Sequence, residues 1–112
     1  MYNTNKKLIK TTMLIIMAGW NLFAQDGKLS GFITDQETGE ALIGANVFIV
    51  ETGNGMSTNK NGYFVLQNIS PGNYILMVSY IGYATLQKEI IFGADESIKM
   101  NLELGIEAVA IT

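Results

Sequence analysis

Residues 70–104 read SPGNYILMVSYIGYATLQKEIIFGADESIKMNLEL, and this stretch decides the class of fold. At its C-terminal end, the apolar residues 98, 100, 102 and 104 alternate strictly with polar ones, which is the period of a half-buried β-strand. Upstream, Tyr74–Ile81 is a nearly continuous apolar run, as expected for a central strand that is covered on both faces. Between them, Thr85–Phe92 predicts a third strand. Its Lys88 falls in phase with apolar residues and marks an edge position.

Towards the N-terminus the chain continues with short apolar runs separated by turn-forming residues, without a 3.6-residue period. Gly53-Asn54-Gly55 and Asn61-Gly62 are typical of tight hairpin turns. The four additional strands predicted from these runs are Lys28–Thr34, Asn46–Glu51, Met56–Asn59 and Tyr63–Asn68. Their expected core-facing residues are Leu29, Gly31, Ile33, Val47, Ile49, Phe64 and Leu66. Together the runs predict an all-β fold, a seven-stranded antiparallel β-sandwich of transthyretin or immunoglobulin-like type.

Residues 1–24 form a separate unit with a basic start, an apolar stretch and a small residue, Ala24, at the end. This order predicts a secretory signal peptide that is cleaved from the mature chain. A transmembrane anchor is disfavoured, because the apolar stretch Met13–Phe23 is about half as long as the ~20 residues that span a bilayer. We therefore expect residues 25–104 to be an exported domain in the periplasm, with no transmembrane segment in the mature chain.

The expected mature chain is acidic. From Gln25 onward it has four lysines, no arginine and ten acidic residues, which is a net charge of −6. Proteins that bind nucleic acids neutralise phosphates with Lys and Arg, so this balance argues against a DNA or RNA partner. It equally disfavours adhesion to an anionic membrane.

Side chains that carry catalysis or bind metals are scarce. The chain has no histidine and no cysteine, which excludes a Ser-His-Asp arrangement, a thiol nucleophile and zinc sites built on these residues. The carboxylate pairs Asp35/Glu37 and Asp95/Glu96 lie in predicted turns, where solvated carboxylates are the simpler interpretation. Asn59 and its neighbours supply oxygen atoms, but calcium prefers carboxylates. The sequence predicts no enzyme, no cofactor and no catalytic, cofactor-binding or metal-binding residues.

Tyr80 and Tyr83 flank Ile81-Gly82 near the end of a predicted strand. Their rings are candidate contacts for a protein partner or a glycan, because exposed aromatic rings stack on such surfaces. The simpler interpretation is that Tyr80 is half-buried in the sandwich and Tyr83 fixes the following strand. A carbohydrate-binding β-sandwich is the alternative function, with Phe32, Phe48 or Tyr83 as its exposed aromatic residues.

The order of these signals resembles the carboxypeptidase regulatory-like domain family, whose members have a prealbumin-like sandwich fold. The resemblance covers residues 27–104. It rests on Gly31 with Thr34-Asp35, Gly39–Ala45 (GEALIGA), Asn61–Phe64 (NGYF), Pro71–Tyr74 (PGNY) and Ser79–Tyr83 (SYIGY). These pieces contain turn and packing residues and no reactive group, which implies an appended, non-catalytic domain.

The leader, this domain and a C-terminal IEAVAIT together resemble the N-terminus of TonB-dependent outer-membrane receptors of the Bacteroidetes type. In those receptors the sandwich precedes a short energy-coupling segment, a plug and a barrel. The resemblance implies an accessory or docking domain of a nutrient receptor, which is tethered to the outer membrane and contacts periplasmic proteins or the attached plug and barrel. Residues 105–112 are then a tail or the start of the coupling segment, which adds a strand to a partner's sheet. The candidate strand-addition residues are Ile106, Glu107, Ala108, Val109, Ala110, Ile111 and Thr112.

Overall fold

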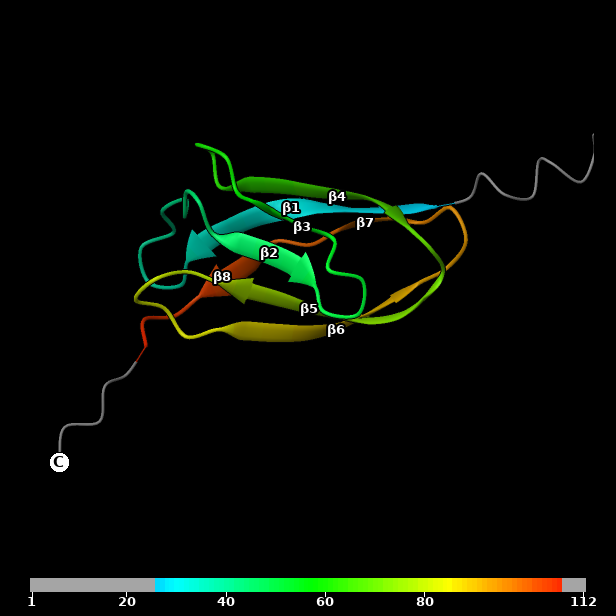
Figure 1. Cartoon of the computed structure of the whole chain (residues 1–112). Coiled ribbons are helices and arrows are strands. Elements are labelled where there is room, and N and C mark those ends of the chain that lie inside the picture. The colour runs from blue at the N-terminus through cyan, green and yellow to red at the C-terminus, as the bar shows by residue number, and fades with distance from the viewer. Residues whose placement is uncertain (1–25, 108–112) are drawn as a thin grey trace, which may run out of the picture.

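The structure is a computed structural model that describes residues 26–107, and the predicted leader lies outside this range. The regular elements of the described part are β-strands, which confirms the all-β class (Figure 1). In chain order they are β1 (Gly27–Asp35), β2 (Asn46–Ile49), β3 (Gly55–Ser57), β4 (Tyr63–Ile69), β5 (Gly72–Ser79), β6 (Leu86–Phe92), β7 (Ser97–Lys99) and β8 (Leu102–Leu104). Over these residues there is no helix long and apolar enough to span a membrane.

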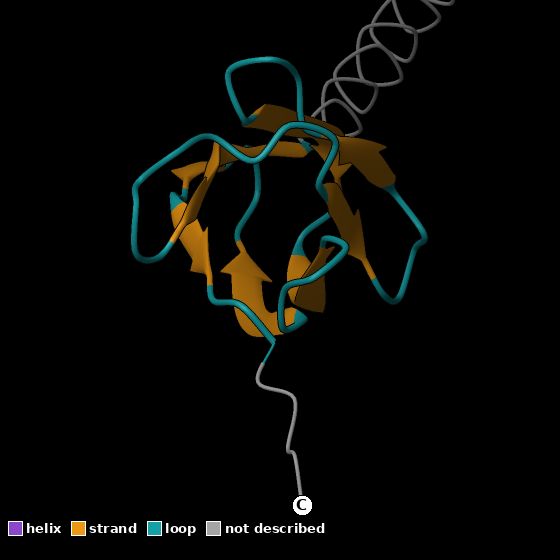
Figure 2. Cartoon of the chain, turned by 90° about the vertical axis from the view of Figure 1, so that its left-hand side faces the viewer, coloured by secondary structure: helices purple, strands orange, loops and turns teal. Residues whose placement is uncertain are grey.

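The strands form two sheets that enclose the core, so the predicted sandwich is confirmed (Figure 2). One sheet has the order β4-β1-β7, with β8 also paired to β1. The other has the order β3-β2-β5-β6. β1 therefore lies inside its sheet, between β4 on one side and the two C-terminal strands on the other.

The described residues contain eight strands instead of seven, because the strand expected over 98–104 is divided into β7 and β8. The break falls at Met100 and Asn101, where Asn101 Oδ1 accepts a hydrogen bond of 3.1 Å from the Phe32 amide. A Cβ atom placed on Gly31 would lie 1.9 Å from the Met100 carbonyl oxygen. The chain passes so close to β1 at this point that only glycine fits.

The sandwich is not purely antiparallel, which corrects the prediction. β7 and β8 both run parallel to β1, with Leu29 opposite Ile98 and Ile33 opposite Leu102. The other strand pairs are antiparallel. The error arises because alternation of apolar and polar residues reports which face of a strand is buried and not the direction of its neighbour.

The core follows the predicted alternation. Every residue expected to face the core from the four N-terminal strands is buried, namely Leu29, Gly31, Ile33, Val47, Ile49, Phe64 and Leu66. Near the C-terminus, Leu102 and Leu104 are buried, whereas Ile98 and Met100 are half-buried. The period-2 pattern therefore identified the inner face of these strands correctly.

β5 is central in its sheet, between β2 and β6, as its apolar run predicts. The expectation that both of its faces are covered is wrong, because only Leu76 and Val78 are buried. Ile75 and Met77 on the opposite face are half-buried, and Met77 lies across from Phe48 of β2. An antiparallel sheet can expose one face, and neighbouring apolar side chains then shield one another.

The edge and turn predictions have mixed outcomes. β6 is an edge strand with Lys88 exposed, as predicted. β2 and β3 pair as a hairpin, as predicted, but the connection is residues 50–54 and its turn precedes Gly53. The turn at 61–62 is not a hairpin turn, because β3 and β4 belong to different sheets. It carries the chain from one sheet to the other.

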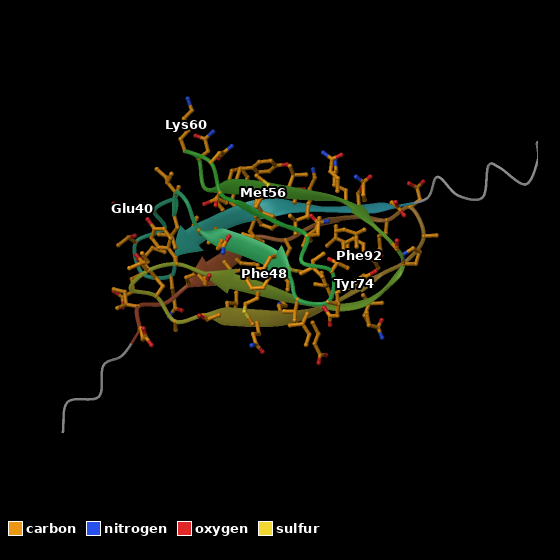
Figure 3. The ribbon with its side chains drawn as sticks, in the orientation of Figure 1. Glu40, Phe48, Met56, Lys60, Tyr74 and Phe92 are labelled. Carbon is orange, nitrogen blue, oxygen red and sulfur yellow. The ribbon has the colours of Figure 1, made fainter. Side chains whose placement is uncertain are left out.

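The chain enters the sandwich at one end, the entry end, and leaves it at the other, the exit end. At the entry end β1 begins, and the turns before β5 and before β7 lie beside it (Figure 1). At the exit end β1 finishes and the chain leaves after β8, among the loops 36–45, 58–62 and 80–85 (Figure 2). Figure 3 shows Tyr74 and Phe92 towards the entry end, and Glu40 and Lys60 at the exit end.

Candidate functional site at the exit end

The last described residues are held at the exit end by the loop that precedes β6. Tyr83 and Ile106 form an antiparallel bridge. Two backbone hydrogen bonds of 2.8 and 3.1 Å, one on each side of the bridge, join residues 82–84 to residues 105–107. We call this contact the exit pairing. It holds residues 105–107 beside the loop at the point where the chain leaves the sandwich.

A tight turn prepares the loop for the exit pairing. The Tyr83 amide donates to the Tyr80 carbonyl oxygen at 3.0 Å. Gly82 has a φ of 88°, in the left-handed region that glycine adopts without strain. Ile81, at the tip of the turn, is 96% exposed. The rings of Tyr80 and Tyr83 then pack on each other, with centroids 5.5 Å apart and planes tilted by 49°.

Tyr83 also ties this turn to the end of β1. Its hydroxyl donates to Asp35 Oδ2 at 2.6 Å, across 48 positions of sequence. The other carboxylate oxygen, Oδ1, accepts the amides of Glu37 at 2.7 Å and Thr38 at 3.0 Å. Asp35 is only 7% exposed. One buried carboxylate therefore fixes the turn after β1 with one oxygen and the tyrosine with the other.

These hydrogen bonds change the protonation behaviour of both partners. The bond from Tyr83, followed by those from the Thr38 and Glu37 amides, lowers the pKa of Asp35 below its ordinary value of 3.8. The bond to Asp35, with a contribution from desolvation, raises the pKa of Tyr83 from 10.0 to about 12. At neutral pH the carboxylate is thus ionised and the hydroxyl keeps its proton, which is the state in which the bond is strongest.

The aromatic residues singled out in the sequence occupy different places. Tyr80 and Tyr83 are both half-buried and pack against the core, and the Tyr83 hydroxyl is engaged by Asp35. Phe32 is 43% exposed on β1, whereas Phe48 is half-buried on β2, in the other sheet. The three aromatic residues considered for glycan contact therefore do not form one surface. The described contacts of Tyr83 reach Asp35 and Ile106, so this residue joins the turn before β6 to the end of β1 and to the exit pairing.

The candidate strand-addition segment is described only at its start. Ile106 is 65% exposed, and Glu107 is exposed beside it. Both belong to the exit pairing. The remaining candidates of this segment, Ala108, Val109, Ala110, Ile111 and Thr112, lie outside the described residues.

Most of the other polar side chains considered in the sequence accept hydrogen bonds from backbone amides in turns. Glu96 Oε1 accepts the Gly93 amide at 2.8 Å. Asn59 Oδ1 accepts the amides of Asn61 at 2.9 Å and Tyr63 at 3.0 Å. Asp35 departs from the prediction of a solvated turn carboxylate, because its turn forms but its side chain is buried. Between residues 26 and 107, no group of three or more acidic, histidine or cysteine side chains is placed to hold a metal ion.

Sequence reasoning missed Asp35 as the centre of this site. A local signal existed, because Asp at the start of a turn-forming stretch accepts the amides that follow it. Its second partner, Tyr83, is far away in sequence, and no spacing rule connects the two. The Gln36 amide, which donates to the Leu104 carbonyl oxygen at 2.9 Å, adds a further link that only the fold reveals.

Two curated relatives are receptors. This chain is 29% identical to the TonB-dependent receptor P3 of Formosa agariphila over 106 residues, which are 93% of the chain and 10% of the receptor. It is 34% identical to the TonB-dependent receptor SusC of Bacteroides thetaiotaomicron over 103 residues, covering 88% of the chain and 10% of that receptor. The chain thus spans about a tenth of the length of these relatives.

A solved structure has a similar fold, and a family model matches most of the sequence. A cohesin–X-dockerin complex from Acetivibrio cellulolyticus matches with a TM-score of 0.60 at 24% identity, over 76% of this chain and 61% of the matched chain. At this identity the likeness concerns the fold alone. Residues 29–111 match the model of the CarboxypepD_reg-like domain. Because this match covers most of the sequence and agrees with the sandwich observed, the chain belongs to the CarboxypepD_reg-like domain family.

Proposed function

We propose that residues 25–104 are a non-catalytic accessory domain in the N-terminal part of a TonB-dependent outer-membrane receptor. The two receptor relatives support this setting. In this proposal residues 1–24 are cleaved during export, and the domain lies in the periplasm. It contacts the attached plug and barrel or another periplasmic protein. Its acidic charge and its turn-bound carboxylates fit contacts with proteins better than a chemical reaction.

The exit pairing is the observation that carries this proposal. β8 ends at Leu104, and the chain then leaves the sandwich in an extended form with Ile106 65% exposed. The hydrogen bond between Tyr83 and Asp35 holds this point in place relative to the core. Residues 105–107 are therefore already held in place, and their own loss of conformational freedom on binding is small.

Residues 106–112 act, in this proposal, as the coupling segment. An extended segment adds to the free edge of a partner's sheet through main-chain hydrogen bonds, and alternate side chains contribute specificity. The partner that fits is the periplasmic domain of the TonB energy-coupling protein. The sandwich would position the segment without opening.

Titration of the ¹⁵N-labelled full chain with that TonB domain, followed by NMR, tests the proposal. We expect the amide signals of residues 108–112 to shift. The amide signals of β1 should stay in place, because pre-organised domains move little when they bind. If no signal of residues 108–112 shifts at saturating TonB domain, the coupling-segment assignment is wrong.

A matched pair of variants examines the mode of binding. The double variant Val109→Pro with Ile111→Pro removes two amide donors, and we expect it to weaken binding at least about ten-fold. The control, Val109→Ala with Ile111→Ala, keeps both amides and should lose less affinity. Equal losses in the two variants would show that side chains and not the main chain carry the contact, contrary to strand addition.

A further inference from the structure

The two chain ends of the domain lie at opposite ends of the sandwich and belong to neighbouring strands (Figure 1). β1 begins at the entry end, and β8 finishes at the exit end. The two strands run parallel and pair directly, with residues 33–35 opposite residues 102–104. Tension between residues 26 and 107 therefore pulls β1 and β8 in opposite directions along their shared axis.

This arrangement loads the contact between β1 and β8 in shear. Main-chain hydrogen bonds between strands lie across the strand direction, so a force along the strands is shared by all of them at once. When two strands are instead separated from one end, each bond in turn bears the whole force. Two further bonds extend the shear-loaded contact, from the Met100 amide to the Ser30 carbonyl oxygen at 2.8 Å and from the Gln36 amide to the Leu104 carbonyl oxygen at 2.9 Å.

Side-chain packing opposes sliding in the same direction. Leu102 and Leu104 are 6% and 1% exposed, and Ile33 on β1 is fully buried. A slip of β8 by one residue would turn the two leucines away from the core, because side chains alternate between faces. At Gly31 the Met100 backbone occupies the place that a side chain would take, so the two segments also pack closely at this point.

The exit pairing is weaker under the same tension. It consists of two backbone hydrogen bonds, and none of residues 105–107 is buried. Its opening exposes little apolar surface, whereas displacement of β8 exposes two core leucines. The exit pairing should therefore open before the β1–β8 contact does.

We propose that the sandwich is a force-resistant link in its polypeptide. Tension between the chain ends first opens the exit pairing, which releases residues 105–107, and is then held by the β1–β8 contact while the sandwich stays folded. This inference rests on the strand topology. Only the source of the tension, a partner that pulls on residues 106–112, rests on the proposed function.

Single-molecule force spectroscopy on the full chain tests this link. The chain has no cysteine, so introduced cysteines define the points of attachment. The pair Asp26→Cys and Thr112→Cys loads β1 and β8 in shear, whereas Glu37→Cys with Thr112→Cys peels β8 from β1 at the exit end. We expect the main rupture force to be roughly two-fold higher or more in shear. Equal rupture forces in the two directions would overturn the proposal.

A proline variant tests the order of events in the shear direction. Glu107→Pro removes the amide that donates to the Gly82 carbonyl oxygen. We expect the early, small extension to disappear and the main rupture force to stay unchanged. The matched control Glu107→Ala keeps the amide and should show both events. If Glu107→Pro lowers the main rupture force as far as the peeling direction does, the exit pairing bears the force and the proposal is wrong.

The force experiment and the binding experiment can each refute one proposal without refuting the other. A chain that resists force in shear but binds no TonB domain supports the link and refutes the coupling segment. A chain that binds the TonB domain but ruptures equally in both directions supports the coupling segment and refutes the link.

Discussion

At each end of the sandwich, a tyrosine hydroxyl makes a hydrogen bond that holds the chain in place, and we call these bonds the entry fastening and the exit fastening. The two bonds span very different lengths of sequence. At the entry end, the Tyr74 hydroxyl donates to the Ser70 carbonyl oxygen at 2.7 Å, only four residues earlier. Its ring meets Phe92 edge to face, with centroids 6.4 Å apart (Figure 3). At the exit end, the hydroxyl of Tyr83 reaches across 48 positions to Asp35. One fastening closes a turn, and the other joins separate parts of the fold.

This difference determines when each fastening can exist. A bond across four residues costs little chain entropy and can form in a partly folded chain, whereas a bond across 48 residues depends on the whole sandwich. The exit end should therefore respond to changes anywhere along its contributing segments. The entry end should respond mainly to changes close by.

Truncation of a buried side chain at each end should have the largest effect. Leu104 at the exit end is 1% exposed and Ile69 at the entry end is 3% exposed. We expect Leu104→Ala and Ile69→Ala each to lower the free energy of unfolding by about 2–5 kcal/mol, as measured by urea denaturation. Hydrogen exchange should separate them, because Leu104 lies next to the exit pairing, so Leu104→Ala should accelerate exchange of the Glu107 amide more than Ile69→Ala does. Equal acceleration in both variants would contradict the local character of the entry end.

A pair of threonines sharpens the comparison through buried hydrogen bonds. At the exit end, Thr58 is 4% exposed, and its hydroxyl donates to the Leu42 carbonyl oxygen at 2.5 Å and accepts the Ala45 amide at 2.9 Å. Thr58→Val leaves two buried groups unpaired, which should cost about 1–3 kcal/mol of unfolding free energy. At the entry end, Thr52 accepts only the Asn54 amide at 3.2 Å, in an exposed turn. Thr52→Val should change stability by less than about 0.5 kcal/mol, and a comparable loss in both variants would count against the comparison.

Removal of the two tyrosine hydroxyls compares the fastenings directly. Tyr74→Phe loses an exposed neutral hydrogen bond, which should cost about 0.5–1 kcal/mol of unfolding free energy. Tyr83→Phe loses a bond to an ionised carboxylate and should lower the thermal midpoint further. It should also speed exchange of the Ala84 amide, which belongs to the exit pairing. A thermal midpoint lower in Tyr74→Phe than in Tyr83→Phe would show that the entry fastening is the stronger of the two, contrary to this prediction.

The pH dependence of the exit fastening is the smallest effect expected. Because the folded pKa of Tyr83, about 12, exceeds its ordinary 10.0, the stabilisation is complete below pH 10 and is lost as the pH rises towards 12. Because the pKa of Asp35 is lowered, its contribution is complete above 3.8 and is lost as the pH falls below that value. The stability difference between wild type and Tyr83→Phe should therefore be flat from about pH 5 to 9 and shrink on both sides. In acid, the corresponding difference for Tyr74→Phe should stay constant, since its acceptor is a backbone carbonyl.

The two ends also differ in how much of them the sequence predicts. At the entry end, β4 and β5 are separated by Ser70 and Pro71, beside the turn residues of the PGNY piece, and the core positions of the strands follow the period of burial, because both signals are local. The parallel direction of β7 and β8 could not be predicted, because the alternation of apolar and polar residues carries no information on the direction of the neighbouring strand. Asp35 looked like one of several turn carboxylates, and its burial depends on a tyrosine brought from another strand connection. The break at Asn101 was hidden for the same reason, because its partner Phe32 lies on β1.

The pairing of β1 with β7 and β8 has a consequence for the order of folding in time. Among the described strands, β1 is the first to be synthesised and its parallel partners β7 and β8 are the last, so contacts such as Phe32 with Asn101 join residues 69 positions apart. Contacts of this span form slowly and only after the intervening chain is available. Until Leu104 arrives, one side of the first strand stays empty and the core cannot close. For a chain that is exported as we propose, the sandwich can close on the far side of the inner membrane only after β7 and β8 have followed β1 across.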